Sequence, residues 1–159
     1  MDGLLSRTGR DAFGTAEDWQ AMLDRHAPLF SELVPGSAVG FVPRTGSGIQ
    51  PGKHVAGVVN AGGAGEMLTW VMQADGMRAQ LRDYSGFQNA GVDLLLVADE
   101  DGLAAMRDAV AGEALSIIKR QIRGGGIMFF VMRTKYELQD AGYEDLLDSL
   151  GLAFLGACR

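Results

Sequence analysis

Two short and almost continuously apolar segments constrain the fold of this chain more than any other feature of its sequence. Residues 92–98 read VDLLLVA and residues 127–132 read IMFFVM. Runs of this length are typical of strands that are buried on both faces, and they fall far short of the roughly 20 residues that span a bilayer. The sequence therefore predicts two strongly buried strands, and it predicts no membrane partner.

The segment between the two apolar runs has the period of a helix. Its apolar residues recur along one side from Leu103 to Ile122, while Gly112 weakens the middle. Glycines at 124–126 are expected to end this helix, because glycine enters the left-handed region freely. One long helix is therefore predicted between two strands.

A further helix and a last strand are expected after the second apolar run. Thr134 is predicted to open the helix, residues 141–142 to interrupt it, and residues 152–157 to form the strand. Strands that are joined through helices normally lie parallel, with right-handed crossovers. The C-terminal half thus predicts a β-α-β-α-β unit with parallel strands.

The N-terminal half has a different pattern. Residues 1–14 are expected to form an extended arm, and Thr15 is expected to cap an amphipathic helix that is interrupted at Pro28. Strands are predicted at residues 37–42 and 55–59, because both segments are apolar and are bounded by glycine and proline.

Residues 66–84 fit either a hairpin or a helix. In the hairpin, Asp75 and Gly76 form a type I′ turn, since this dipeptide is preferred where both central residues have positive φ. In the helix, apolar residues between Met67 and Met72 share one face. We favour the hairpin.

Taken together, these elements predict an α+β fold in which residues 15–159 form a single domain with one mixed β-sheet. An N-terminal helix and an antiparallel meander precede the parallel strands, and helices cover at least one face of the sheet. If residues 66–82 were helical instead, the fold would be an α/β open sheet.

The composition argues against several classes of partner and cofactor. A net charge of −6 disfavours nucleic acid. Two histidines, His26 and His54, and the single Cys158 provide neither the spacing of a zinc site nor an internal disulfide. We expect no metal and no cofactor, and we expect a cytoplasmic protein because the N-terminus lacks the apolar segment of a secretion signal.

Charged residues at two strand ends form the first candidate site. They are the charged residues Asp99, Asp101, Arg133 and Lys135, together with the polar Thr134. If the two strands are parallel, both groups lie at one edge of the sheet, where open α/β sheets bind ligands. The basic group and the helix N-terminus would then hold an anionic or phosphate-bearing small molecule. Two simpler interpretations stay open: the acids cap a helix, or the two groups form a salt bridge with each other.

Surface charges form the second candidate site. The last predicted helix is strongly acidic, and the outward face of the hairpin is basic. Surfaces of this kind can dock a protein partner of complementary charge. The predicted contact residues are Glu137, Asp140, Glu144, Asp148, Arg78 and Arg82.

No catalytic motif accompanies these sites, and the G-x-S-x-G elbow of hydrolases is absent from the sequence. The sequence therefore favours a small non-enzymatic binding, adaptor or assembly subunit that contacts a protein partner or forms a homo-oligomer. The alternative is a binding protein or enzyme for a small anionic ligand, with its site at residues 99–101 and 133–135.

Overall fold

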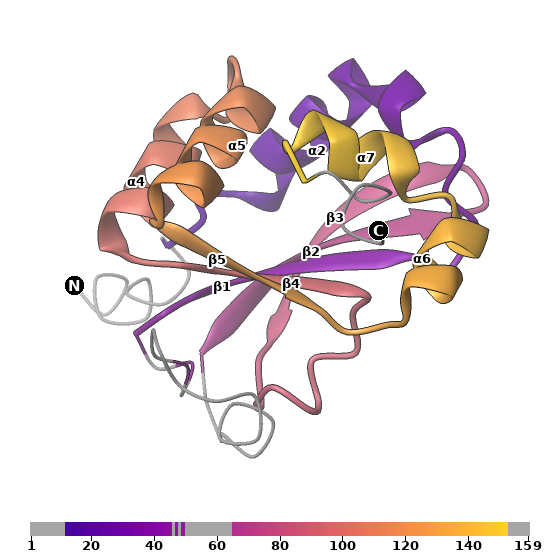
Figure 1. Cartoon of the computed structure of the whole chain (residues 1–159). Coiled ribbons are helices and arrows are strands. Elements are labelled where there is room, and N and C mark those ends of the chain that lie inside the picture. Colours follow the sequence, from indigo (N-terminus) through magenta and orange to yellow (C-terminus); the bar gives the residue numbers. More distant parts are fainter. Residues whose placement is uncertain (1–11, 46, 48, 50–64, 153–159) are drawn as a thin grey trace.

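A computed structural model describes residues 12–45, 47, 49 and 65–152 of the chain (Figure 1). The described residues contain one five-stranded sheet with the order β3-β2-β1-β4-β5. Its strands are β1 (Ala38–Pro43), β2 (Glu66–Gln73), β3 (Gly76–Asp83), β4 (Leu94–Ala98) and β5 (Ile127–Val131). Both parallel and antiparallel pairs occur in this sheet, which confirms the predicted α+β class.

The helices gather on one face of the sheet (Figure 1). They are α2 (Ala16–Arg25), the 3-10 helix η1 (Ala27–Phe30), α4 (Glu100–Ala109), α5 (Ala114–Gly124), α6 (Lys135–Ala141) and α7 (Glu144–Ser149). The main core lies between them and the sheet, where Phe30 and Phe41 pack around the fully buried Trp70. A smaller core, to which Tyr84 and Phe87 belong, covers the opposite face.

The hairpin predicted for residues 66–84 is confirmed, but its turn differs from the expected type. Gln73 pairs with Gly76, so the two residues between them form the turn. No described residue other than glycine has a positive φ, whereas Gly76 has a φ of 126°. A type I′ turn centred on Asp75 and Gly76 is therefore wrong, because Asp75 does not adopt the positive φ that this turn requires.

The long helix predicted between the two apolar runs is two helices, α4 and α5. The chain turns at residues 110–113, where the amide of Gly112 donates to the carbonyl of Ala109. A single crossover helix would have brought β5 back parallel to β4. The helical hairpin adds one reversal, so β5 runs antiparallel to β4. The predicted run of parallel strands is wrong, and in the described sheet the parallel pair is β1 with β4.

The second apolar run was expected to form a strongly buried strand, and this expectation is also wrong. β5 is an edge strand of the sheet. Phe129 and Phe130 are half-buried, and Val131 is 48% exposed. The first apolar run does form a fully buried strand, β4, because it lies between β1 and β5.

The helix expected from Thr134 is confirmed, together with its interruption. Thr134 caps α6 in a capping box with Glu137, and Gly142 ends the helix with a φ of 87°. The strand predicted at residues 55–59 lies outside the described residues, as do residues 1–11 of the arm and nearly all of the strand predicted at 152–157.

Candidate functional site

The two charged groups that were predicted to share a sheet edge lie at opposite ends of β4. Ala98 pairs with Ile127, and Leu94 pairs with Val131. Asp99 therefore follows one end of β4 while Arg133 lies beyond the other, roughly 17 Å away along a five-residue strand. The joint site is wrong, and so is a salt bridge between the two groups, because both required parallel strands.

Asp99 acts as the cap of a helix, which is one of the interpretations left open by the sequence. Its carboxylate accepts a hydrogen bond of 2.7 Å from the amide of Gly102 at the start of α4. Asp101 is exposed in the first turn, where the helix dipole favours an acid. The described residues contain no cluster of three or more His, Cys, Asp or Glu that could hold a metal ion.

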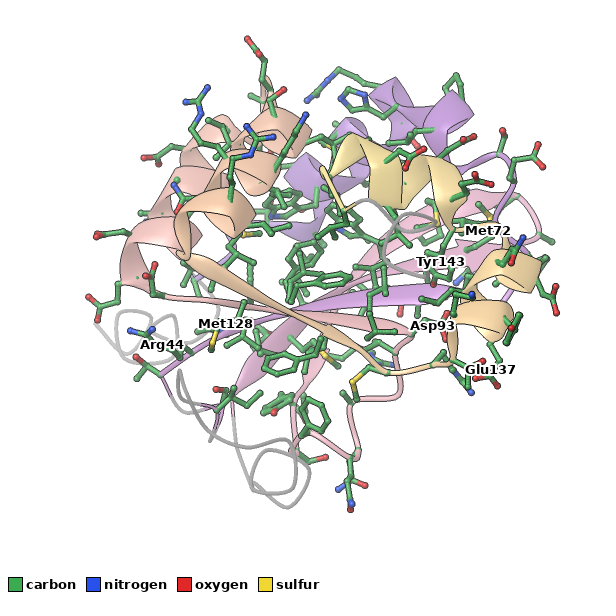
Figure 2. The ribbon with its side chains drawn as sticks, viewed as in Figure 1. Arg44, Met72, Asp93, Met128, Glu137 and Tyr143 are labelled. Carbon is green, nitrogen blue, oxygen red and sulfur yellow. The ribbon has the colours of Figure 1, made fainter. Side chains whose placement is uncertain are left out.

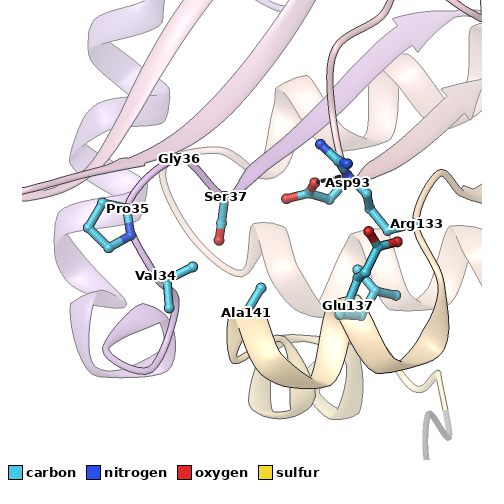
Figure 3. A pocket seen from close by; sticks show the side chains of 9 residues that line it. Val34, Pro35, Gly36, Ser37, Asp93, Arg133, Glu137 and Ala141 are labelled. Atoms are coloured by element: carbon cyan, nitrogen blue, oxygen red, sulfur yellow. Dashed lines mark hydrogen bonds and ion pairs between the residues drawn. The ribbon is translucent and has the colours of Figure 1, made fainter.

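Arg133 lies instead in a pocket of about 260 Å³ between the start of β1 and α6 (Figure 3). We call it the Ser37–Arg133 pocket. Its apolar wall includes Val34, Leu138 and Ala141, and its polar side chains are Ser37, Asp93, Arg133 and Glu137. Figure 2 shows Asp93 and Glu137 at the same end of the sheet as Tyr143, whereas Arg44 and Met128 lie at the opposite end.

Asp93 is the polar centre of this end of the sheet. One carboxylate oxygen, Oδ2, accepts hydrogen bonds from the Ala38 amide at 3.0 Å and from Tyr143 Oη at 2.6 Å. The other oxygen, Oδ1, accepts from Nε of Arg133 at 2.9 Å. Burial raises the pKa of Tyr143 well above its usual range, and the hydrogen bond and charge of Asp93 raise it further. Tyr143 therefore remains a neutral donor to Asp93.

The arrangement leaves part of Arg133 available to a ligand. Its hydrogen bond to Asp93, followed by the charge of Asp93, raises the pKa of the guanidinium, which is therefore always charged. The side chain of Arg133 is 54% exposed, and Nε makes its ion pair with Asp93. No described residue accepts a hydrogen bond from the terminal nitrogens Nη1 and Nη2. These atoms form the planar edge that binds a carboxylate with two hydrogen bonds.

Glu137 is held in the pocket by the capping box of α6. Its Oε1 accepts from the amide of Thr134 at 2.8 Å, while its own amide donates to the hydroxyl of Thr134. The backbone and then the side chain of Thr134 lower the pKa of Glu137, which keeps this carboxylate charged. Its second oxygen accepts no hydrogen bond from a described residue.

Ser37 is the buried polar group of the pocket. It is 4% exposed, and its backbone amide and carbonyl are both used in hydrogen bonds. Its hydroxyl lies close enough to Tyr143 to lower the pKa of that group, but it makes no hydrogen bond of ordinary geometry with a described residue. Figure 3 shows this hydroxyl directed into the space between Val34 and Ala141.

The other predicted site residues do not join this pocket. Lys135 lies 4.9 Å from the ring centre of Tyr136, Arg78 pairs with Asp75, and Nη2 of Arg82 donates to the Ala90 carbonyl. The acidic residues predicted as a docking surface, apart from the pocket residue Glu137, are exposed on α6 and α7. They are Asp140, Glu144 and Asp148. Their role in binding a partner stays a prediction.

Comparisons with known proteins place few constraints on this site. No family model matches the chain, and no curated protein matches it. One similar solved structure is a conserved hypothetical protein of Thermus thermophilus, described as possibly a sterol carrier protein. It has 15% identity and a TM-score of 0.43, over 89% of this chain and 87% of that one. Another is sterol carrier protein 2 of Yarrowia lipolytica in its apo form, with 14% identity and a TM-score of 0.36 over 90% and 94% of the two chains.

Neither superposition is close enough to carry an argument about the ligand of this chain. Within the described residues, no helix has the length and apolar character needed to cross a bilayer.

Proposed function

We propose that this protein binds a small zwitterion of amino-acid type in the Ser37–Arg133 pocket. The single observation that carries this proposal is the arrangement of Ser37 and Arg133. Among the described residues, the nearly buried hydroxyl of Ser37 has no hydrogen bond of ordinary geometry, and the two terminal nitrogens of Arg133 in the same pocket have no acceptor. Buried polar groups usually have a partner, so a ligand that supplies one gains affinity.

Charge favours a zwitterion over a phosphate. Arg133 contributes one positive charge to the pocket, while Asp93 and Glu137 contribute one negative charge each, which leaves a net charge of −1. A phosphate dianion would meet two carboxylates here. A ligand carboxylate on the terminal nitrogens of Arg133, with its ammonium near the free oxygen of Glu137, satisfies both signs.

The volume of the pocket and the chemistry of its wall narrow the class of ligand further. The pocket volume of about 260 Å³ is slightly below the roughly 300 Å³ at which pockets for drug-sized ligands begin. Val34, Leu138 and Ala141 provide an apolar surface for a short aliphatic side chain. An α-amino acid with such a side chain has the size, the two charges and the apolar part that the pocket accommodates.

The proposal is tested by calorimetric titration of the full chain with three molecules that share one skeleton. They are L-leucine, the amine 3-methylbutylamine and the acid 4-methylpentanoic acid. The zwitterion is expected to bind, and loss of either charged group should weaken binding at least about tenfold, which corresponds to 1.4 kcal/mol. Inorganic phosphate and a sterol complete the panel.

Two variants locate the binding. Ser37→Ala should weaken binding about tenfold while stabilising the fold slightly, because it removes a buried hydroxyl that lacks a good partner. Arg133→Gln should abolish binding, whereas Arg123→Gln, at an exposed arginine on α5, should leave binding unchanged. Binding of the sterol alone, or zwitterion binding that Ser37→Ala leaves unchanged, contradicts the proposal.

A further inference from the structure

The two edges of the sheet differ in how they are protected. At β3, the side-chain amide of Gln20 occupies the outer edge, since it donates to the Met77 carbonyl at 3.0 Å and accepts from the Ala79 amide at 2.9 Å. Arg78 and Arg82 add charge to the same strand. Covering groups and charged side chains are the usual means by which proteins prevent an edge strand from pairing with another chain.

Among the residues that the structure describes, none provides such protection to β5. Its sequence, IMFFV, contains no charged residue, no proline and no glycine. Val131 is 48% exposed, and Phe129 and Phe130 are half-buried. A strand of this composition is typical of the interior of a sheet, where both neighbours are other strands. An apolar edge strand without protection is a template for pairing.

Hydrogen bonds at both ends of the β4–β5 pair determine which backbone groups of β5 are used. The Met132 amide donates to the Asp93 carbonyl at one end, and the Asp99 amide donates to the Gly126 carbonyl at the other. Along an antiparallel strand, successive residues direct their amides and carbonyls alternately toward the partner strand and away from it. The even-numbered residues of β5 therefore direct their backbone groups toward β4.

The odd-numbered residues of β5 therefore direct their amides and carbonyls away from the sheet. They are Ile127, Phe129 and Val131. No described residue forms a backbone hydrogen bond with these outward groups. Phe129 is the middle residue of the strand, so the outward groups are arranged symmetrically about it.

We propose that β5 pairs with β5 of a second copy of this chain, in antiparallel register about Phe129. Each Phe129 then exchanges two hydrogen bonds with the Phe129 of the partner subunit, and Ile127 does the same with the partner's Val131. One two-fold axis satisfies all the outward groups at once, as an isologous interface requires. The two sheets become one continuous sheet.

The side chains on both faces suit this arrangement. Phe129 packs at the border of the main core, while Met128 and Phe130 pack at the border of the smaller core, where the rings of Phe130 and Phe87 are 5.4 Å apart. Pairing places these half-buried side chains beside their counterparts and extends both apolar layers. In this register Arg133 lies opposite the uncharged Gly125 of the partner subunit.

The test is the mass of the purified full chain in solution, measured by sedimentation equilibrium. We expect twice the chain mass of 16.9 kDa for the wild type. Val131→Lys should give the monomer mass, because each partner would bring an ammonium into the apolar contact. Tyr136→Lys alters a more exposed apolar residue, 70% exposed and outside β5, and should leave the dimer intact.

Hydrogen exchange distinguishes pairing of β5 with a second copy from coverage of β5 by another segment of the same chain. The amides of Phe129 and Val131 should be protected in the wild type, and the Phe129 amide should lose protection in Val131→Lys, while protection of the β1 amides stays constant in both. A wild-type monomer overturns the proposal, and so does a dimer that survives Val131→Lys. Protection of these amides in a monomer would also overturn it, because another segment of the same chain would then cover β5.

Discussion

Tyr143 donates a hydrogen bond of 2.6 Å to a carboxylate oxygen of Asp93, which lies fifty residues earlier in the chain. The same oxygen accepts from the Ala38 amide, so one atom links the start of β1, the segment before β4 and the start of α7. Through its other oxygen, Asp93 also orients Arg133. The geometry of the Ser37–Arg133 pocket therefore depends on Tyr143, which does not itself line the pocket.

Tyr143→Phe tests this dependence. The substitution keeps the buried ring and removes a hydrogen bond to a charged group, so the free energy of unfolding should fall by about 1.5–3 kcal/mol. Urea denaturation measures this change. Tyr136→Phe is the matched control, because Tyr136 is 70% exposed and should tolerate the change. Equal stability of Tyr143→Phe and the wild type would show that the bond contributes nothing.

The stability of the protein should fall at alkaline pH. Burial, and then Asp93, raise the pKa of Tyr143 in the folded state above the value of about 10 for an unfolded chain. Above about pH 10 the unfolded state loses this proton more readily than the folded state, so the free energy of unfolding decreases. Below that pH the contribution is fully present.

Urea denaturation from about pH 9 to pH 11 checks this sign. Burial also raises the pKa of Tyr84, so the wild type and Tyr143→Phe should both lose stability, but the variant should show the shallower slope. Identical slopes in the two proteins would refute the role of Tyr143. Tyr84→Phe serves as a second comparison, with an intermediate slope expected because the shift of Tyr84 has burial as its only cause.

Most elements of the fold could be predicted from the sequence because their signals are local. Thr134 and Asp99 cap helices, and the hairpin follows from two alternating strands around a turn. The direction of β5 could not be predicted in this way. It depends on whether residues 110–113 continue a helix or reverse the chain, and Gly112 was the only sign of a break.

The candidate site was predictable only in part, for a related reason. Arg133 was recognised as a charged residue at a strand end, but its partner Asp93 and the buried Ser37 were missed. Asp93 is the one charged residue within the apolar run 92–98, and a charge in such a run indicates a buried partner. The identity of that partner depends on the order of the strands, which no local pattern contains.

Asp99→Ala distinguishes a helix cap from a cation site. Loss of the 2.7 Å hydrogen bond to the Gly102 amide should lower the free energy of unfolding by about 1 kcal/mol, whereas Asp99→Asn should retain most of the stability. Denaturation with and without added Mg²⁺ or Ca²⁺ provides the measurement. Stabilisation by either cation that disappears in Asp99→Ala would be incompatible with a purely capping role.

Gly142→Ala tests how strictly the end of α6 is held beside the pocket. Gly142 has a φ of 87°, and a Cβ at this position would clash with the carbonyl oxygen of Glu32. The strain of a left-handed alanine and the clash with backbone should together lower the free energy of unfolding by about 2 kcal/mol or more. The damage should extend to the pocket, because the neighbouring Ala141 lines it and its carbonyl accepts from the Val34 amide.

Gly124→Ala is the matched control for this substitution. Gly124 is the last residue of α5, its φ is not positive, and no atom lies within 4 Å of an added Cβ. Alanine there should be neutral or stabilise the helix by up to about 1 kcal/mol. Equal effects of the two substitutions on urea denaturation would mean that the approach of α6 to Glu32 is not rigid. The wall of the pocket could then adjust to a ligand instead of being held in place for it.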